Sequence, residues 1–446
     1  MSSRQFGPPM KLFCFTFFYV VVSGVLVQCL ILPYFFPNLH AGDGLLKGMD
    51  SVGYHQKALE LLAQMNVKGW SVWTLKLEGS SSHAGLMAAI YYVLGPKPYY
   101  LLIWNGLLWG ITAVSWYAIF QRIFPKNAQW NVIPVLLMLT LPSSLQWTSQ
   151  FLKDTPCITG ISLFLYAFIQ SAVYDEKDDI AQWVRNIGIP LLLGAFFIWL
   201  VRPYILQLVL AGSLATIPIV GLAYLVRRAP PGIMTTTVAV TIITLLLSWV
   251  VNSIDRSSDR FNLTIPSAST VCDSNFINCG VHRVQVIRDG YCYDKDKVGS
   301  AIDCDLSMTN WVEAAAYLPR AMEIAFLSPF PNMWFAKANQ PGGSQMRLVA
   351  GMETTLAYFT FSLALILLIS RRVTFSLPMI LAITYLLMPL LIETYVNPEI
   401  GTLYRMRYIF WTGLIGISLN LIISYLLFLK QTGSAQFYAL KDVIYE

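Results

Sequence analysis

The chain has 446 residues, of which 56% are hydrophobic and only 12% are charged, and its formal net charge is +6. Soluble domains carry about 25% charged residues, so this composition excludes a water-soluble globular protein, and the modest charge comes with no nucleic-acid-binding motif. Apolar runs recur that can cross a hydrocarbon core about 30 Å thick. Because they do not alternate as barrel strands do, they predict an all-α polytopic membrane protein in the lipid bilayer.

About ten membrane-spanning helices are expected, within a range of about ten to twelve. The first apolar run is too long for a typical signal peptide and is expected to remain as a helix. A shorter apolar stretch, 84–95, is bounded by Pro96 and Pro98 and is expected to be a half-helix or a helix on the membrane surface. The predicted spans are 12–36, 98–121, 128–147, 156–174, 187–205, 206–226, 232–252, 349–370, 376–393 and 408–429.

Lysine and arginine in short loops predict which end of each span faces the cytoplasm. With ten spans every such loop falls on the cytoplasmic side, as Arg122 and Lys126 after the second span and Arg371 and Arg372 after the eighth illustrate. An eleventh crossing at 84–95 would reverse all later loops. The charge bias therefore favours ten spans. The exterior loops are then 37–83, 148–155, 253–348 and 394–407.

The longest exterior loop contains four cysteines in a polar setting. They are Cys272, Cys279, Cys292 and Cys304. Clustered thiols of this kind predict two disulfides, with three connectivities open, because disulfides persist in oxidising compartments; zinc binding is the alternative. The loop also divides the chain into three parts. These are an N-terminal membrane module (1–252), an exterior loop domain (253–348) and C-terminal membrane helices (349–446).

The first exterior loop, 37–83, carries groups suited to acid–base chemistry. Asp50 begins a segment whose apolar stripe has helical periodicity, so Asp50 or Ser51 is an N-cap, or Asp50 is a carboxylate that takes a proton from an acceptor. Asp43 stands between glycines and is a turn residue or a rival base. His55 either packs against neighbouring side chains or contacts a substrate. Together with Asp43 and Asp50 it also forms a candidate divalent-metal site, although no dense ligand spacing requires one.

Basic side chains collect in the other exterior loops. Lys153 and Asp154 directly precede a span, where the helix dipole alone would favour the acid. Arg202 ends a span on the exterior side, where a guanidinium either snorkels or binds a phosphate through its fork. Arg405 and Arg407 repeat the pattern, and their i,i+2 spacing points them in different directions. Further candidate contacts to a substrate are Tyr54, Tyr204 and Arg320.

The sequence contains no P-loop, no Rossmann fingerprint and no Ser–His–Asp signature. Nucleotide-driven chemistry on the cytoplasmic face is therefore not expected. The energy for a reaction would have to arrive with an activated substrate outside the membrane. Ionisable residues are scarce within the predicted spans, which disfavours a transport path lined by charges.

Several short segments resemble the GT-C superfamily of membrane glycosyltransferases, which use polyprenyl-phosphate-linked sugars. Protein O-mannosyltransferases and the lipid A aminoarabinose transferase belong to this superfamily. The resemblance runs through most of the chain, although each motif is short. The segments that carry it are Asp43 with 50–54 in the first loop, the small-residue stretch 83–95, the Pro-containing stretch 142–154, the later 328–331 and 401–408.

The resemblance implies inverting transfer of a sugar from a polyprenyl-phosphate-linked donor to a glycan, lipid or protein acceptor on the exterior face. It implies Asp50 as the base, with Asp43 as a rival, and Asp154 is a third catalytic candidate. It also implies that basic side chains hold the donor phosphate, for which Lys153, Arg202, Arg405 and Arg407 are the candidates. The resemblance requires no cofactor, and a divalent metal is the one candidate.

The expected location is a bacterial inner membrane, with the site facing the periplasm. Three other functions remain open on the sequence. One is a polysaccharide polymerase or O-antigen-type ligase, which also uses polyprenyl-linked glycans. The second is a transporter of lipid-linked glycans, and the third is a receptor or scaffold that uses the cysteine-bearing loop for partners.

Overall fold

The computed structural model describes residues 7–77, 82–172, 179–226, 231–255, 276–293, 299–338, 342–370, 372–373 and 375–444. Every regular element within these ranges is a helix, as the composition predicts. The α-helices are α1 (Pro8–Leu26), α2 (Asp50–Lys68), α3 (Ser82–Leu94), α4 (Leu102–Ile123), α5 (Val132–Leu139), α6 (Pro142–Thr148), α7 (Asp154–Ser171), α8 (Ile180–Trp183), α9 (Ile189–Val201), α10 (Ile205–Leu225), α11 (Pro231–Asp255), α12 (Phe276–Cys292), α14 (Trp311–Leu327), α15 (Pro331–Trp334), α16 (Gly343–Ile369), α17 (Leu377–Val396), α18 (Ile400–Met406) and α19 (Tyr408–Ile444).

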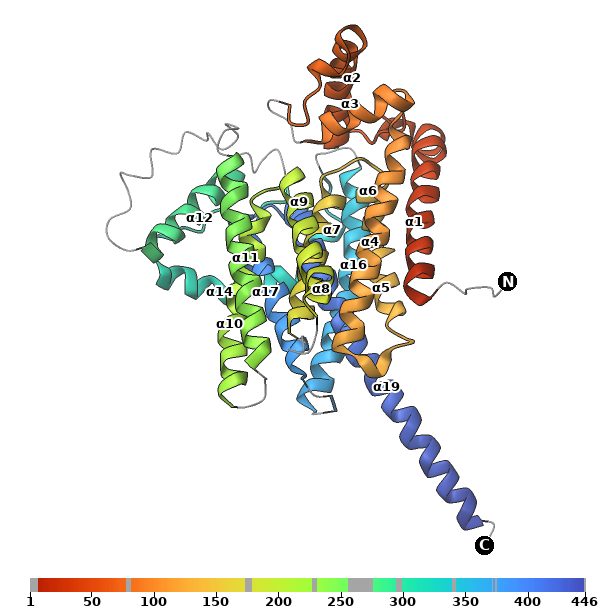
Figure 1. Cartoon of the computed structure of the whole chain (residues 1–446), viewed down its shortest axis with the longest axis vertical. Helices are drawn as coiled ribbons and strands as arrows, with labels where there is room; N and C mark the ends of the chain where they lie inside the picture. The colour runs from red at the N-terminus through yellow and green to blue at the C-terminus, as the bar shows by residue number, and fades with distance from the viewer. Residues whose placement is uncertain are drawn as a thin grey trace.

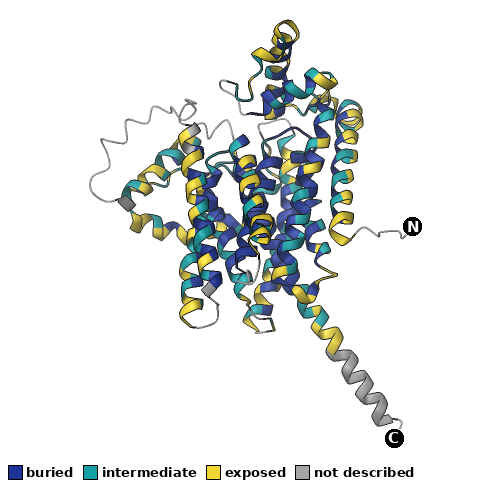
Figure 2. Cartoon of the chain, in the orientation of Figure 1, coloured by how far each residue is buried: buried dark blue, intermediate teal, exposed yellow. Residues whose placement is uncertain are grey.

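Within the described ranges, eight helical runs are long and apolar enough to cross a membrane, and they match eight of the ten predicted spans. Apolar side chains remain exposed on their outer faces while the centre of the bundle is buried (Figure 2). This is the arrangement expected when lipid covers the outside of a helical bundle. The runs are Pro8–Phe35, Pro98–Ile123, Ile180–Val201, Ile205–Leu225, Gly232–Val251, Gly343–Ile369, Leu377–Val396 and Tyr408–Gln431.

The other two predicted spans depart from a simple crossing. The prediction of one continuous helix over 128–147 is wrong, because α5 ends at Leu139 and Pro142 begins α6. Proline suits the first position of a helix and ends a preceding one. The predicted span 156–174 corresponds to α7, where every residue except Tyr166 is buried. Since α7 packs against α4, α9, α11 and α17, its surface need not be apolar.

Small residues bring α7 and α9 into close backbone contact. A Cβ added at Gly160 would lie 2.8 Å from the carbonyl oxygen of Gly194, and a Cβ at Gly194 would lie 2.9 Å from the carbonyl oxygen of Gly160. Helix interfaces in membranes are enriched in small residues because they permit this approach. The glycine pair therefore fixes how deeply α9 packs against the central helix.

Two of the loops predicted to be exterior, 37–83 and 148–155, meet at the end of the bundle where α2 and α3 lie beyond the other helices, whereas α14 of the loop 253–348 lies along the side of the bundle (Figure 1). Gln150 ties the two loops together: its Oε1 accepts from the backbone N–H of Leu46 at 3.1 Å and from the hydroxyl of Ser51 at 3.2 Å, and its Nε2 donates to the carbonyl of Gly44 at 3.2 Å. The stretch 84–95 forms most of α3, which packs on α2. Of the two interpretations of this stretch, the surface helix fits its place in the fold.

The loop 253–348 forms α12 and α14, which contact each other and α17. Cys292 and Cys304 form a disulfide, which confirms the disulfide interpretation for this pair. Cys279 is also disulfide-bonded, and Cys272 lies outside the described residues. The backbone N–H of Ile302 donates to the carbonyl of Pro398 at 3.1 Å, so this loop also contacts the segment between α17 and α18.

Candidate functional site

The candidate site is centred on Asp154, the first residue of α7. Its Oδ1 lies 3.1 Å from Nη2 of Arg202, and its Oδ2 accepts from Nε of Arg405 at 2.7 Å and lies 2.6 Å from Nη2 of the same arginine. Only 2% of the Asp154 side chain is exposed. A buried carboxylate is costly unless it is paired and hydrogen-bonded. Here two guanidinium groups supply the pairing.

The electrostatics of Asp154 follow from this geometry. The residue is the first of α7 and lies ahead of the predicted span 156–174. Burial would raise the pKa of the Asp154 carboxyl, but the charges of Arg202 and Arg405 and their hydrogen bonds outweigh it and hold the pKa at about 2. Asp154 is therefore a carboxylate at neutral pH, and it serves as the fixed anion that orders both arginines.

Local backbone geometry delivers the two arginines to this point. α9 ends at Val201, where Arg202 leaves the helical conformation and is followed by Pro203. Arg405 belongs to α18, a helix of only seven residues between α17 and α19. The cation of Arg405 also lies 6.0 Å from the ring centroid of Trp147 on α6, a contact that favours a guanidinium over an ammonium.

Asp50 is the second carboxylate at this cluster. Nη1 of Arg405 donates to Oδ2 of Asp50 at 3.2 Å, and 52% of the Asp50 side chain is exposed. The expectation that Asp50 or Ser51 caps α2 is wrong, because Met49 is the N-cap residue and Asp50 is the first residue inside the helix. An acid in the first turn is still favoured by the helix dipole. One guanidinium thus joins a buried carboxylate to an accessible one.

Lys153 and a group of aromatic side chains from α2 and α3 lie beside this ion-pair cluster. Nζ of Lys153 lies 5.5 Å from the ring centroid of Tyr54. The ring of His83 lies between Tyr54 and Phe151, with centroid distances of 5.4 and 4.5 Å. Burial lowers the pKa of His83 to about 3, so this ring is neutral. The helical stripe found in the sequence of α2 thus forms part of a packed aromatic layer beside the ion pairs.

Asp43 and His55 form a different cluster with Lys97 and Tyr91. Nε2 of His55 lies 3.7 Å from Oδ2 of Asp43, Nζ of Lys97 lies 3.3 Å from Oδ1 of Asp43, and Nδ1 of His55 lies 2.8 Å from the hydroxyl of Tyr91. Asp43 adopts a φ of 48° in its turn. Asp50 is paired with Arg405 rather than with these residues. Within the described residues no group of three or more His, Cys, Asp or Glu side chains converges in a way that could hold a metal.

Arg407 points away from Arg405, as their spacing predicts. It is fully buried, and its Nη1 donates to the carbonyls of Ile324 and Ala325 at 2.8 and 2.7 Å and to the hydroxyl of Ser328 at 2.9 Å. These groups lie at the C-terminal end of α14. The structure therefore places Arg407 as an anchor between α14 and the start of α19 and does not bring it to Asp154.

Two other predicted contacts lie at different places. Arg320 on α14 binds Asp303 through Nε at 3.0 Å and Glu323 at 2.8 Å. Partial burial would raise the pKa of Asp303, but hydrogen bonds from Arg320 and Tyr317 hold it below its usual value. Tyr204 begins the turn into α10, two residues after Arg202, and packs against the main core. Tyr204 is thus near the cluster, whereas Arg320 belongs to a separate ion-pair group on α14.

Two buried acids on the late helices were missed by the sequence analysis. Glu353 on α16 is 3% exposed and Glu393 on α17 is 4% exposed. An acid inside an apolar helix is the usual signal for a functional or structural polar contact in membranes. Both residues stand at the predicted spans 349–370 and 376–393, where single acids among many apolar residues are easily overlooked.

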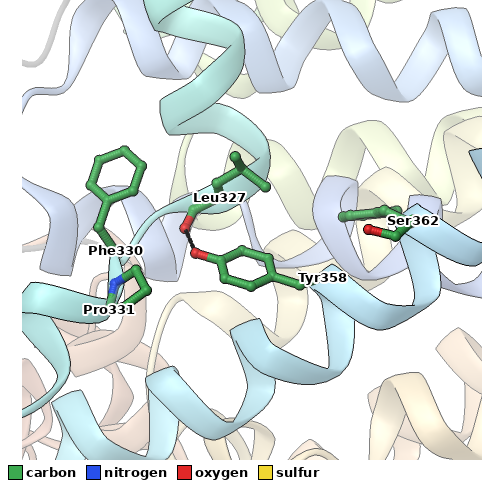
Figure 3. A pocket seen from close by; sticks show the side chains of 6 residues that line it. Leu327, Phe330, Pro331, Tyr358 and Ser362 are labelled. Atoms are coloured by element: carbon green, nitrogen blue, oxygen red, sulfur yellow. Dashed lines mark hydrogen bonds between the residues drawn. The ribbon is translucent and has the colours of Figure 1, made fainter.

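An apolar cavity of about 390 Å³ lies between the α14–α15 turn and α16 (Figure 3). The hydroxyl of Tyr358 donates to the carbonyl of Leu327 across it. Its lining is uncharged and mostly apolar, which suits a hydrocarbon chain or an apolar side chain rather than an ion. The lining residues are Leu327, Phe330, Pro331, Tyr358, Phe361 and Ser362.

The geometry permits acid–base and anion-binding chemistry at one point. Asp50 is an accessible carboxylate whose position is set by Arg405, and Arg405 and Arg202 are cations with well-defined orientations. Comparison of the chain with protein-family models, with curated proteins and with solved structures finds no match in any of the three.

Proposed function

We propose that the protein is a membrane glycosyltransferase that moves a sugar from a polyprenyl-phosphate-linked donor to an acceptor on the exterior face of a bacterial inner membrane. The observation that carries the proposal is the Asp50–Arg405–Asp154 arrangement, in which one arginine holds an accessible carboxylate beside a buried one. Such a site offers a base and a cation to the same reacting centre.

The proposed reaction is an in-line displacement with inversion. Asp50 accepts the proton of the acceptor hydroxyl as the acceptor oxygen forms a bond to the anomeric carbon. The bond between that carbon and the phosphate oxygen breaks, and the electron pair leaves with polyprenyl phosphate. Arg405 and Arg202 stabilise the negative charge of the leaving group, because a guanidinium fork matches phosphate oxygens.

The partners of Arg405 support an exchange at the moment of donor binding. Its Nε and Nη2 are directed to Asp154, whereas Nη1 contacts half-exposed Asp50 at 3.2 Å. Because solvent reaches Asp50 and screens its attraction to Arg405, a phosphate oxygen can replace Asp50 on Nη1. Asp50 would then be released toward the acceptor while Asp154 keeps the arginine in place.

The apolar surroundings support a lipid-linked substrate. A polyprenyl chain requires an apolar surface that is continuous with the bilayer, and the candidate spans of this protein have exposed apolar faces. The cavity beside α16 is a further apolar surface of this kind (Figure 3). A polysaccharide polymerase or ligase would use the same groups on a diphosphate-linked glycan.

A transporter of lipid-linked glycans is the second candidate, and the buried acids Glu353 and Glu393 favour it. Ionisable groups inside membrane helices often line a transport path. The two functions are separated by product chemistry. The experiment is to reconstitute the purified protein in liposomes with radiolabelled polyprenyl-linked sugars and cell-envelope acceptors. Label that leaves the lipid in a new covalent product supports transfer, and label that crosses the bilayer while still attached to lipid supports transport.

A further inference from the structure

Glu353 on α16 holds two separate segments through its two carboxylate oxygens. Oε1 accepts from the backbone N–H of Ser143 at 2.6 Å, and Oε2 accepts from the hydroxyl of Ser143 at 2.8 Å and from the hydroxyl of Tyr404. The side chain is 3% exposed. A carboxylate buried to this degree requires such donors, because an unsatisfied one costs several kcal/mol.

Both segments that Glu353 holds also contact Arg405. Tyr404 is the residue immediately before Arg405 on α18. Ser143 lies in the first turn of α6, and α6 also carries Trp147, whose ring lies 6.0 Å from the guanidinium carbon of Arg405. The carboxylate of Glu353 therefore connects α18, which carries Arg405, to α6, whose Trp147 ring faces the guanidinium of Arg405.

α18 depends on such contacts because it is short. It has seven residues, and an isolated helix of this length is unstable in water or in lipid headgroups. Its C-terminal side is anchored by Arg407, which binds carbonyls at the end of α14. The hydrogen bond from Tyr404 to Glu353 is a second anchor, at the residue immediately before Arg405. Together they set the direction in which Arg405 leaves the helix.

We propose that Glu353 is a positioning residue that keeps the fork of Arg405 directed at Asp154 and Asp50. The inference rests on the proposed function for the meaning of that alignment, since Asp50 and Arg405 are the groups assigned to the reaction. Glu353 itself contacts neither donor nor acceptor in this account. Its effect passes through Tyr404 to Arg405 and through α6 to Trp147.

The test compares Glu353→Gln and Tyr404→Phe with a matched control, Thr354→Val. Glutamine keeps the size of the side chain, but it has no charge and only one acceptor oxygen, so it cannot accept on both sides from Ser143 and from Tyr404 as the carboxylate does. Thr354 is the next residue on α16, is fully buried, and donates only within its own helix to the carbonyl of Ala350 at 2.7 Å. The control therefore removes a buried hydroxyl whose hydrogen bond stays within α16.

The first readout needs no enzymatic activity. The protein is labelled with a water-soluble carbodiimide and an amine, and amide formation at Asp50 is measured by peptide mass spectrometry. Exposed Glu60 on the same helix serves as the internal reference. Contact with Arg405 restrains and shields Asp50. Glu353→Gln and Tyr404→Phe should raise the Asp50-to-Glu60 labelling ratio about three-fold or more, and the double variant should add little, because the two residues act through one hydrogen bond.

The second readout is sugar transfer by the same proteins. The positioning role predicts a lower kcat with a nearly unchanged KM for the acceptor in both variants and wild-type values in Thr354→Val. If labelling at Asp50 is unchanged in variants that elute and melt as the wild type does, the inference is overturned. Should Glu353→Gln not fold, Tyr404→Phe decides alone. If the labelling ratio changes in the variants while the wild-type protein transfers no sugar, the positioning role is upheld and the proposed function is rejected.

Discussion

Arg405 donates from Nε to Asp154 and from Nη1 to Asp50, so one guanidinium joins the first residue of α7 to the first residue of α2. The two acids differ in environment: the side chain of Asp154 is 2% exposed and that of Asp50 is 52% exposed. The buried acid is suited to hold the arginine, and the accessible acid is suited to exchange protons with an acceptor. This division of roles predicts a different effect of substitution at Asp154, at Arg405 and at Asp50.

Removing the charge of Asp154 should destabilise the protein. Asp154→Asn leaves Arg202 and Arg405 without their anionic partner, and breaking a buried pair of this kind costs about 3 kcal/mol or more. Thermal unfolding in detergent should therefore shift to clearly lower temperature. Asp179→Asn, at an exposed position before α8, is the control and should unfold as the wild type does. Equal stability of the two variants would refute the structural role of Asp154.

Replacing Arg405 by lysine should impair transfer while the positive charge is retained. A lysine ammonium cannot reach Asp154 and Asp50 with a fixed fork, and it loses the planar contact with Trp147. We expect a fall in kcat/KM of about ten-fold or more, equivalent to about 1.4 kcal/mol. Arg122→Lys, at the exposed end of α4, should leave the rate unchanged. Comparable rates for the two variants would show that charge alone suffices at Arg405.

A methyl group at Gly160 should disturb packing of α7 against α9. Its Cβ would lie 2.8 Å from the carbonyl oxygen of Gly194, and overpacking of this type costs about 1–3 kcal/mol. Gly221→Ala on α10 is the matched control, because open space surrounds that position. The melting temperature should fall for Gly160→Ala and stay level or rise for Gly221→Ala. If both variants melt alike, the close approach of the two helices is not what fixes α9.

The layer formed by α2 and α3 should weaken as the pH falls below about 6.5, the usual pKa of histidine. Burial lowers the pKa of His55, with a smaller contribution from Lys97 that Asp43 opposes. The folded state therefore binds fewer protons than the unfolded state, and stability is lost as the pH falls from the unfolded pKa toward the folded one. Unfolding measured between pH 7.5 and pH 5 should show a smaller loss in His55→Gln.

The control for the pH experiment is His282→Gln, at an exposed position on α12. It should keep the pH dependence of the wild type. A wild-type protein whose stability does not change over this range would contradict the assignment of a neutral, buried His55. The hydrogen bond between Nδ1 of His55 and the hydroxyl of Tyr91 at 2.8 Å is the contact at stake.

Composition and apolar run length predicted the spans well because lipid imposes the same demand on each outer helix. α7 and the break between α5 and α6 do not follow this rule. The bounds of helices that are enclosed by other helices depend on packing and on the positions of proline rather than on contact with lipid. The loop residues Asp50, Asp154, Arg202 and Arg405 were each singled out from the sequence. Their pairing was not, because no local pattern encodes a contact between residues 251 or 355 positions apart.

The sequence did not predict the surroundings of Asp50, Arg407 and Glu353, each for an identifiable physical reason. Asp50 is a residue type that favours the N-cap position of a helix, but Met49 occupies the N-cap of α2. Gln150 is hydrogen-bonded to Ser51 and to the preceding turn, and it thereby fixes where α2 begins. Arg407 has the same sequence setting as Arg405, yet it turns toward the carbonyls at the end of α14. Glu353 was overlooked because a single acid barely changes the mean hydropathy of a long apolar helix, although an acid inside such a helix is itself the signal. Its donors come from α6 and α18.

The measurement that tests the central claim most directly is release of radiolabelled sugar from a polyprenyl-linked donor by purified wild-type, Asp50→Asn and Glu60→Gln proteins. Glu60 is exposed on the same helix, so Glu60→Gln removes an equal charge away from Arg405. The account predicts transfer by the wild type and Glu60→Gln at similar rates and a loss of about 100-fold or more in Asp50→Asn, as expected for removal of a general base. Full transfer by a folded Asp50→Asn protein would contradict it.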